Sequence, residues 1–231
     1  MSRKLKRPGC GRTTSPAASA AGAASRHDFQ HCPFIIGIGQ PDYDLPPNPT
    51  LKDLVDGYIL GGFQAHLERV LDIFRQCDYA TAVKFAGLSR CPVCNHVYPH
   101  QIQVYAAARQ AFSDALCAAA AQLREAADFE ELWEMTCAIA RDTEGIGGLT
   151  CYDASLRIAA NRNILPDVRV YAFRGATVRE GQAEKNVIPA ASFNPVIADT
   201  LPAYQIEDFL CVYGDYRFDM AKRPDGIRVL A

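Results

Sequence analysis

Apolar residues recur every three or four positions along most of this chain, which is the spacing of one face of an α-helix. Val70, Leu71 and Phe74 show the pattern in a predicted helix over residues 51–75, which the pair Gly61-Gly62 is expected to divide. Strand signals are few and short, the best lying at 169–173. The sequence therefore predicts a mainly α fold. Further helices are predicted over residues 80–86, 102–123, 129–141, 149–160 and 204–213.

Composition divides the chain into a tail and one domain. Residues 1–27 are rich in Ser, Ala, Gly and basic residues and have no hydrophobic periodicity. They bury too little surface to offset the entropy of ordering, so we expect a disordered tail. Of the 231 residues, 49% are hydrophobic, which is enough for the core of a single helical domain over residues 28–231.

Charge and hydropathy limit the partners of the protein. The formal net charge is −2, so the chain does not coat nucleic acid by charge alone, and any contact with DNA has to be local and geometric. No apolar run approaches the roughly 20 residues that cross a bilayer, and no signal-peptide core follows the basic start. We therefore predict an intracellular protein, of the cytoplasm and nucleoid or of the nucleus, without a membrane partner. The oligomeric state stays open.

A glycine-rich turn joins two of the predicted helices. Gly145-Ile146-Gly147 follows the helix at 129–141 and precedes the helix at 149–160. Glycine permits positive φ and a close backbone approach, so amide N–H groups at the start of the second helix can donate to a phosphate oxygen. The alternative is that the two glycines only end a helix in a sharp turn.

The run from Glu144 to Ala154 resembles the Gly-hydrophobic-Gly hairpin of helix-hairpin-helix proteins. Together with the residues that follow, it resembles the DNA glycosylases of that superfamily. The resemblance implies a helical fold with a helix-hairpin-helix element at about 129–160, which binds the backbone of duplex DNA. We add Arg169 to the candidate DNA contacts, as one of three arginines that face either phosphate or solvent. The residues implied by the hairpin itself are Gly145, Ile146, Gly147, Gly148 and Thr150.

The resemblance also implies a catalytic residue. In these glycosylases a connector after the second helix presents an aspartate to the flipped nucleotide. Here the connector carries Asp167, which follows Gly145 by 167 − 145 = 22 residues, about the interval of the family. Cleaving an N-glycosidic bond builds positive charge on the sugar, and a carboxylate stabilises that oxocarbenium-like state. The alternative for Asp167 is an ordinary turn residue after Pro166.

Two departures from the family narrow the implied chemistry. Glycosylases that also cut the strand carry a hairpin lysine that forms a Schiff base, and the matching residue here is Leu149. Many relatives bind an iron-sulfur cluster through four cysteines near the C-terminus, but only Cys211 follows Asp167 in this chain. We therefore expect no hairpin-lysine lyase step, no iron-sulfur cluster and no required cofactor.

A loop at residues 90–101 carries two cysteines in Cys-x2-Cys spacing and two histidines in His-x3-His spacing, as in small zinc sites. Four ligands this close would strain a tetrahedral site, so a distant ligand such as Cys77 is one way to complete it. A second interpretation has no metal and places His100 beside a phosphate. A third is an ordinary turn. The candidate ligands of a structural zinc ion are Cys91, Cys94, His96 and His100.

Three functions follow from these observations. The first is a monofunctional DNA N-glycosylase that releases a modified or damaged base, with Asp167 at the reacting sugar and aromatic residues stacking on the flipped base. The second is a non-catalytic helix-hairpin-helix module that binds DNA or docks on a nucleoprotein partner. The third is a metal-clipped interaction protein whose glycine turn touches no nucleic acid. The candidate stacking residues are Trp133, Tyr152, Tyr171 and Phe173.

Overall fold

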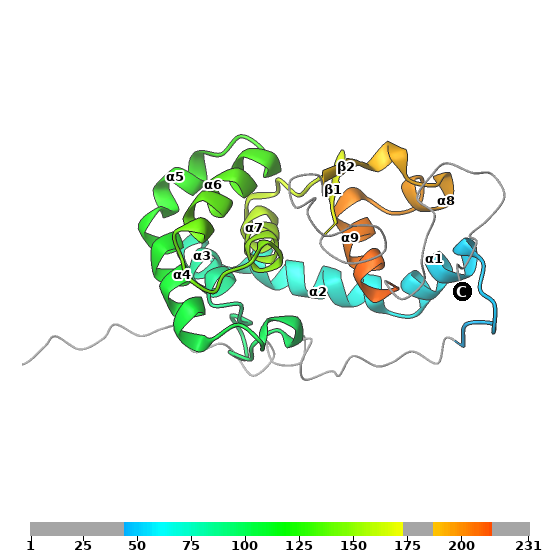
Figure 1. Ribbon diagram of the computed structural model, residues 1–231, viewed down its shortest axis with the longest axis horizontal. Coiled ribbons are helices and arrows are strands. Elements are labelled where there is room, and N and C mark those ends of the chain that lie inside the picture. Colours follow the sequence, from blue (N-terminus) through cyan, green and yellow to red (C-terminus); the bar gives the residue numbers. More distant parts are fainter. Residues whose placement is uncertain (1–43, 173–186, 214–231) are drawn as a thin grey trace, which may run out of the picture.

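The computed structural model describes residues 44–172 and 187–213, and this part of the chain is mainly helical, as the sequence predicts. Figure 1 shows α3 to α7 gathered at one end of the molecule and α1, α8 and α9 at the other, with α2 running between them. The predicted tail at 1–27 lies outside the described residues, as does Phe173.

The first predicted helix is divided at its glycine pair, which confirms the expected break. Helix α1 spans Leu51–Leu60 and begins at a capping box in which Thr50 and Asp53 exchange hydrogen bonds. Gly62 takes a φ of 76°, and α2 then spans Phe63–Gln76. Helix α3 spans Tyr79–Gly87 and begins at the side chain of Asp78, which accepts from the backbone of Thr81.

The single helix predicted over residues 102–123 is wrong in two respects. Helix α4 spans Ala106–Ala118 and α5 spans Ala120–Glu125, with a break at Ala119. Ile102 and Tyr105, which matched the helical spacing, precede α4 and are 66% and 82% exposed. A short 3₁₀ helix at Pro99–Gln101 occupies the chain before them, and the fixed φ of Pro99 suits its first position.

Helices α6 and α7 pack against each other and are joined by a short hairpin segment, residues 142–147. Helix α6 spans Phe129–Arg141, with Asp128 as its cap, and α7 spans Gly148–Arg162. Every residue of α7 from 150 to 160 is buried, because α2, α3 and α6 all pack on it. Helix α7 is therefore the central helix of this end of the molecule.

The second half of the described chain adds a small sheet and two helices. Strand β1 (Arg169–Tyr171) pairs antiparallel with β2 (Val187–Pro189), so the predicted strand is confirmed at its start. A 3₁₀ turn at Ala190–Ser192, α8 (Pro195–Ala198) and α9 (Ala203–Val212) follow. Buried apolar residues form one cluster across α2 to α7 and another between α1, β1, α8 and α9.

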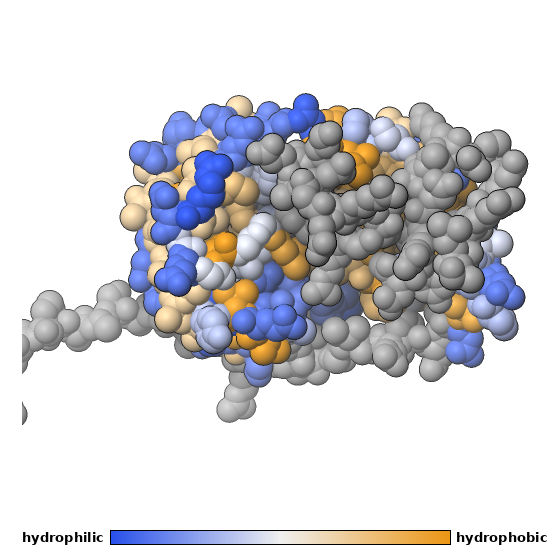
Figure 2. All heavy atoms as spheres, in the orientation of Figure 1, coloured by the Kyte–Doolittle hydropathy of each residue, from blue (hydrophilic) through white to orange (hydrophobic). Residues whose placement is uncertain are grey.

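The outer surface over α5 and α6, at the upper left of Figure 2, carries many hydrophilic residues. Among residues 44–172 and 187–213, no helix combines the length and the apolar character that crossing a bilayer requires.

Candidate functional site

The hairpin segment reverses the chain within six residues. The amide of Thr143 donates to the carbonyl of Ala140, and the amide of Ile146 donates to the carbonyl of Thr143. Gly145 takes a φ of 83°, a left-handed conformation that strains any residue with a side chain. The turn predicted from the glycines is therefore present, and at Gly145 it depends on glycine for its backbone conformation.

The start of α7 is open. Gly147 is the N-cap of the helix, it has no side chain to cap the first amides, and a Cβ atom built on it would meet nothing within 4 Å. Gly148 is also exposed. The first amide N–H groups of α7 have no partner within the helix, because the first turn of any α-helix leaves them free. These first amides of α7, here called the mouth, are thus accessible to a ligand's acceptor oxygen.

Two of the predicted hairpin residues face the protein interior. Ile146 is half-buried and packs against the core, as expected for a residue tucked between the two helices. Thr150 is buried, and its hydroxyl donates to the side-chain oxygen of Gln101 at 2.7 Å. The side chain of Thr150 therefore supports the helix rather than the open mouth.

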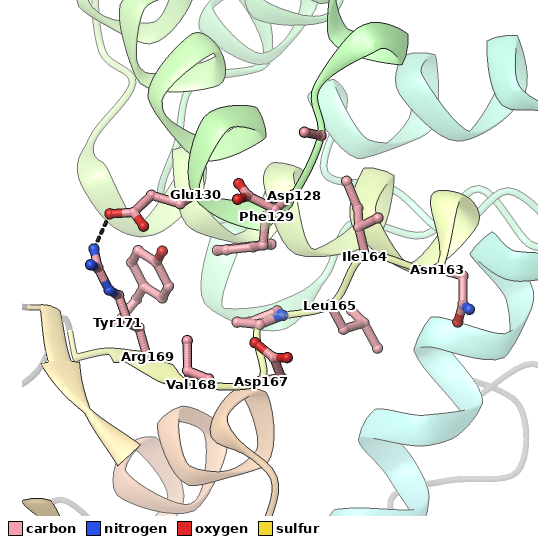
Figure 3. Close-up of a pocket in the computed structure, with 12 residues that line it drawn as sticks. Asp128, Phe129, Glu130, Asn163, Ile164, Leu165, Asp167, Val168, Arg169 and Tyr171 are labelled. Atoms are coloured by element: carbon pink, nitrogen blue, oxygen red, sulfur yellow. Dashed lines mark hydrogen bonds and ion pairs between the residues drawn. The ribbon is translucent and has the colours of Figure 1, made fainter. Parts of the chain in front are cut away.

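Asp167 lies on the connector after α7 and lines a pocket of about 290 Å³, here called the Asp167 pocket. Figure 3 shows Asp167 on one side of this pocket and Asp128 on the other, with the ring of Phe129 in its wall. Asp167 itself is exposed, and Tyr171 completes the aromatic wall, its ring centroid 5.0 Å from that of Phe129.

Arg169 lines the same pocket and forms an ion pair with Glu130 at its rim (Figure 3). The pocket therefore lies beside the first turn of α6, whereas the hairpin segment follows the last residue of that helix. Helix α6 has 13 residues, which gives it a length of about 20 Å at 1.5 Å per residue. The structure thus groups Asp167 with Arg169 and separates both from the hairpin glycines.

Of the candidate zinc ligands, Cys91, Cys94 and His96 lie in one turn, which the amide of Cys91 closes on the carbonyl of His96, and His100 follows in the 3₁₀ helix. Cys91 and Cys94 lie in a tight turn, in which the amide of Asn95 donates to the carbonyl of Cys91. His96 is exposed. Within the described ranges, no group of three or more Cys, His, Asp or Glu side chains is placed to hold a metal ion. The zinc clip stays a prediction, which the metal content of the purified protein tests.

His100 instead belongs to a polar cluster that the sequence did not reveal. Its Nε2 lies 2.5 Å from Oδ2 of Asp153, a residue of α7 that is 9% exposed. The side-chain amide of Gln101 donates to the same oxygen at 2.7 Å. Burial raises the pKa of Asp153, but the charge of Arg157 and these hydrogen bonds outweigh it and hold the pKa below its usual value.

Two acidic residues of α9 complete the cluster. Tyr58 donates to Asp208 at 2.8 Å, yet burial prevails and raises the pKa of Asp208 to about 6. Burial, with repulsion from Asp153 and Asp208, raises the pKa of Glu207 well above its usual value. Grouped buried titratable residues of this kind are typical of functional sites.

The cluster lines a second cavity, of about 280 Å³, between α2, α7 and α9. We call it the Arg157 cavity, because the guanidinium of Arg157 stands in its wall with Cζ 4.0 Å from the ring centroid of Tyr98. The available sequence signal was a pair of acidic residues, Glu207 and Asp208, inside an otherwise apolar helical pattern. No feature of the sequence around Glu207 and Asp208 indicated that they would line the same cavity as Asp153.

Comparison of the chain with protein-family models, with curated proteins and with solved structures finds no match.

The candidate stacking residues within the described ranges are core residues, or nearly so. Tyr152 and Tyr171 are 0% and 2% exposed, and their rings stack 5.7 Å apart. Trp133 is half-buried and packs edge-on against Tyr171.

Proposed function

We propose that the protein binds the backbone of duplex DNA through the hairpin segment and the start of α7. The observation that carries the proposal is the open mouth at Gly147, where the N-cap residue places no side chain over the first amides of the helix and an added Cβ would meet nothing within 4 Å. Amide donors and the positive end of the helix dipole both favour an anion at this position.

The charges around the mouth make this a weak, short-range contact. Arg141 is exposed at the end of α6, but Asp142 and Glu144 are exposed beside it and repel phosphate. The net charge of −2 adds no attraction at longer range. We therefore expect binding with a small salt dependence, with a slope of about −1 in log K against log salt, as for one phosphate neutralised by Arg141, since the backbone amides carry no net charge.

The chemical step that we propose is the release of a modified or damaged base by a monofunctional DNA N-glycosylase, with Asp167 stabilising the charge that develops on the sugar. Asp167 beside a pocket with aromatic walls supports this step, because a base turned out of the helix needs an apolar surface. The mouth and this pocket are about 20 Å apart along α6, which is about six base steps of duplex at 3.4 Å each.

A base-release assay tests the catalytic proposal. Duplexes that each carry one altered base are incubated with the full chain and treated with alkali, which breaks the strand at abasic sites. We expect strand breaks with at least one altered base, and at least a hundredfold lower rate for Asp167→Asn. Release that persists at the wild-type rate in Asp167→Asn would remove this residue from the chemistry.

The alternative is a non-catalytic module that uses the same mouth to hold DNA or a nucleoprotein partner. The exposure of Asp167 favours it, since a carboxylate in water stabilises a nearby cation less than a buried one does. Binding to duplex without base release on any substrate would support this alternative.

A further inference from the structure

The Arg157 cavity combines apolar side chains with acidic ones. Its volume of about 280 Å³ is at the lower end of the range for small-molecule sites, so it suits a ligand the size of one ring. The lining includes three aliphatic side chains of α2 and three carboxyl groups of α7 and α9, namely Leu67, Val70 and Leu71 and Asp153, Glu207 and Asp208.

Acidic groups outnumber basic ones in this lining. Arg157 is the one Lys or Arg residue among the described residues of the lining, and its Nη2 lies 3.6 Å from Oδ2 of Asp153. Within the described ranges, no Lys, Arg or His side chain forms an ion pair with Glu207 or Asp208. The cavity therefore holds two carboxyl groups without an ionic partner.

Glu207 is the unused group of the cavity. It is 9% exposed, and within the described chain its side chain makes no hydrogen bond. Its carboxyl oxygens retain accessible surface, unlike the sealed Nη1 of Arg157. A buried carboxyl without a donor or an opposite charge is costly, so a ligand that supplies both would gain affinity here.

The surroundings of Glu207 favour a positive charge. The neighbouring charges that shift its pKa are those of Asp153 and Asp208, and both raise it. Burial, with repulsion from Asp153, also raises the pKa of Asp208. An ammonium group beside these carboxyl groups would offset the repulsion and lower both pKa values.

We propose that the Arg157 cavity binds a small organic cation, whose ammonium group donates to the carboxyl oxygens of Glu207 and whose apolar body lies against Leu67 and Val70 of α2. Arg157 does not compete for this position, because its guanidinium is held over the ring of Tyr98 at 4.0 Å. The site is separate from the hairpin mouth and from the Asp167 pocket, and it does not depend on the proposed DNA chemistry.

Other ligand classes fit less well. A carboxylate would stand among three acidic groups and would be repelled by them. A neutral alcohol offers a donor to Glu207 but no opposite charge. A metal ion needs several ligands that converge on one point, and within the described residues no three Cys, His, Asp or Glu side chains do so.

Four probes test the proposal: benzylammonium, benzyl alcohol, benzoate and methylammonium. Each is titrated into the full chain at pH 7 and followed by protein NMR, with Kd taken from the saturating shifts. We expect saturable binding of benzylammonium, with the other three at least tenfold weaker, because each lacks either the positive charge or the apolar ring. Absence of saturation by benzylammonium, or equal or tighter binding of any other probe, would overturn the proposal.

A pair of charge-neutralising variants locates the site. Glu207→Gln keeps the size of the side chain and should raise Kd for benzylammonium at least tenfold while the NMR spectrum remains that of a folded protein. Asp72→Asn is the matched control, because Asp72 is an exposed carboxyl of α2 outside the lining, and its Kd should stay within twofold of wild type. An unchanged Kd in Glu207→Gln, or an equal loss in both variants, contradicts the proposal. Asp167→Asn is expected to leave this Kd unchanged, which separates the site from the proposed glycosylase.

Discussion

Two aspartates in one cavity illustrate how local surroundings set charge. Asp153 receives hydrogen bonds from His100 and Gln101 and has a lowered pKa, whereas Asp208 receives one from Tyr58 and has a raised pKa. The lowered pKa of Asp153 owes most to the charge of Arg157, one helical turn away, but the hydrogen bonds of both aspartates come from residues about 50 or 150 positions away, which the sequence does not place. The role of Gly145 was predictable, since a left-handed turn residue is a local feature, whereas Gly147 has an extended backbone that does not require glycine.

Asp208→Asn is expected to change the pH dependence of stability. A carboxyl whose pKa is about 6 when folded, against about 4 when unfolded, binds its proton more tightly in the folded state, so stability falls as pH rises through this range. The variant has no carboxyl to titrate, so its stability relative to wild type should rise by about 2 kcal/mol between pH 4 and pH 7. Urea unfolding at several pH values measures the difference, and a difference that stays constant with pH would refute the assignment.

At the scale of elements, the helices were predicted where periodicity is local and sustained, as in α6 and α9. The break between α4 and α5 at Ala119 was missed, because alanine carries no signal for the end of a helix. The pairing of β1 with β2 was also missed, because residues 187–189 are a short strand whose partner lies 16 or more positions away. Tertiary contacts decide such elements.

Close contact between α3 and α4 requires glycine at position 87. A Cβ atom on Gly87 would lie 2.5 Å from Cα of Ser113, a backbone atom that cannot move alone. Gly87→Ala is therefore expected to lower the free energy of unfolding by about 2 kcal/mol. Gly147→Ala, where the new methyl group meets open space, is the matched control and should stay within about 0.5 kcal/mol of wild type. Equal stability of the two variants in urea would contradict this packing.

The two helices that flank the hairpin hold a pair of thiols. The Sγ atoms of Cys137 in α6 and Cys151 in α7 are 2.7 Å apart, and this hydrogen bond lowers the pKa of Cys137 while raising that of Cys151. Treatment with diamide, which accepts two hydrogens, is expected to join them in a disulfide and to stabilise the protein by about 2 kcal/mol. Peptide mapping identifies the pair, and Cys137→Ser should abolish the cross-link.

Cys117→Ser is the control for that experiment, because Cys117 is exposed on another helix and should not affect the cross-link. Recovery of Cys137 and Cys151 as separate free thiols after oxidation would show that the two helices do not hold the sulfur atoms together.

For the whole molecule, the sequence predicted the helical class and a turn between α6 and α7 but not how the functional groups are distributed. Helix α7 begins at the hairpin mouth, carries Asp153 and Arg157 in its buried middle, and ends at the connector of Asp167. Three candidate sites therefore share one central helix. The Arg157 cavity could not be predicted, because it forms only where α2, α7 and α9 meet.

The central claim is that the mouth at Gly147 binds a DNA phosphate, and variants of this residue test it directly. Its φ of −95° accepts a side chain, and Asp is a favourable N-cap, so Gly147→Asp should remain folded. Kd for a fluorescent duplex is measured by anisotropy for the wild type, Gly147→Ala and Gly147→Asp. We expect Gly147→Ala to stay within threefold of wild type and Gly147→Asp to bind at least tenfold more weakly, because its carboxylate occupies the phosphate position. Wild-type affinity in Gly147→Asp would contradict the account.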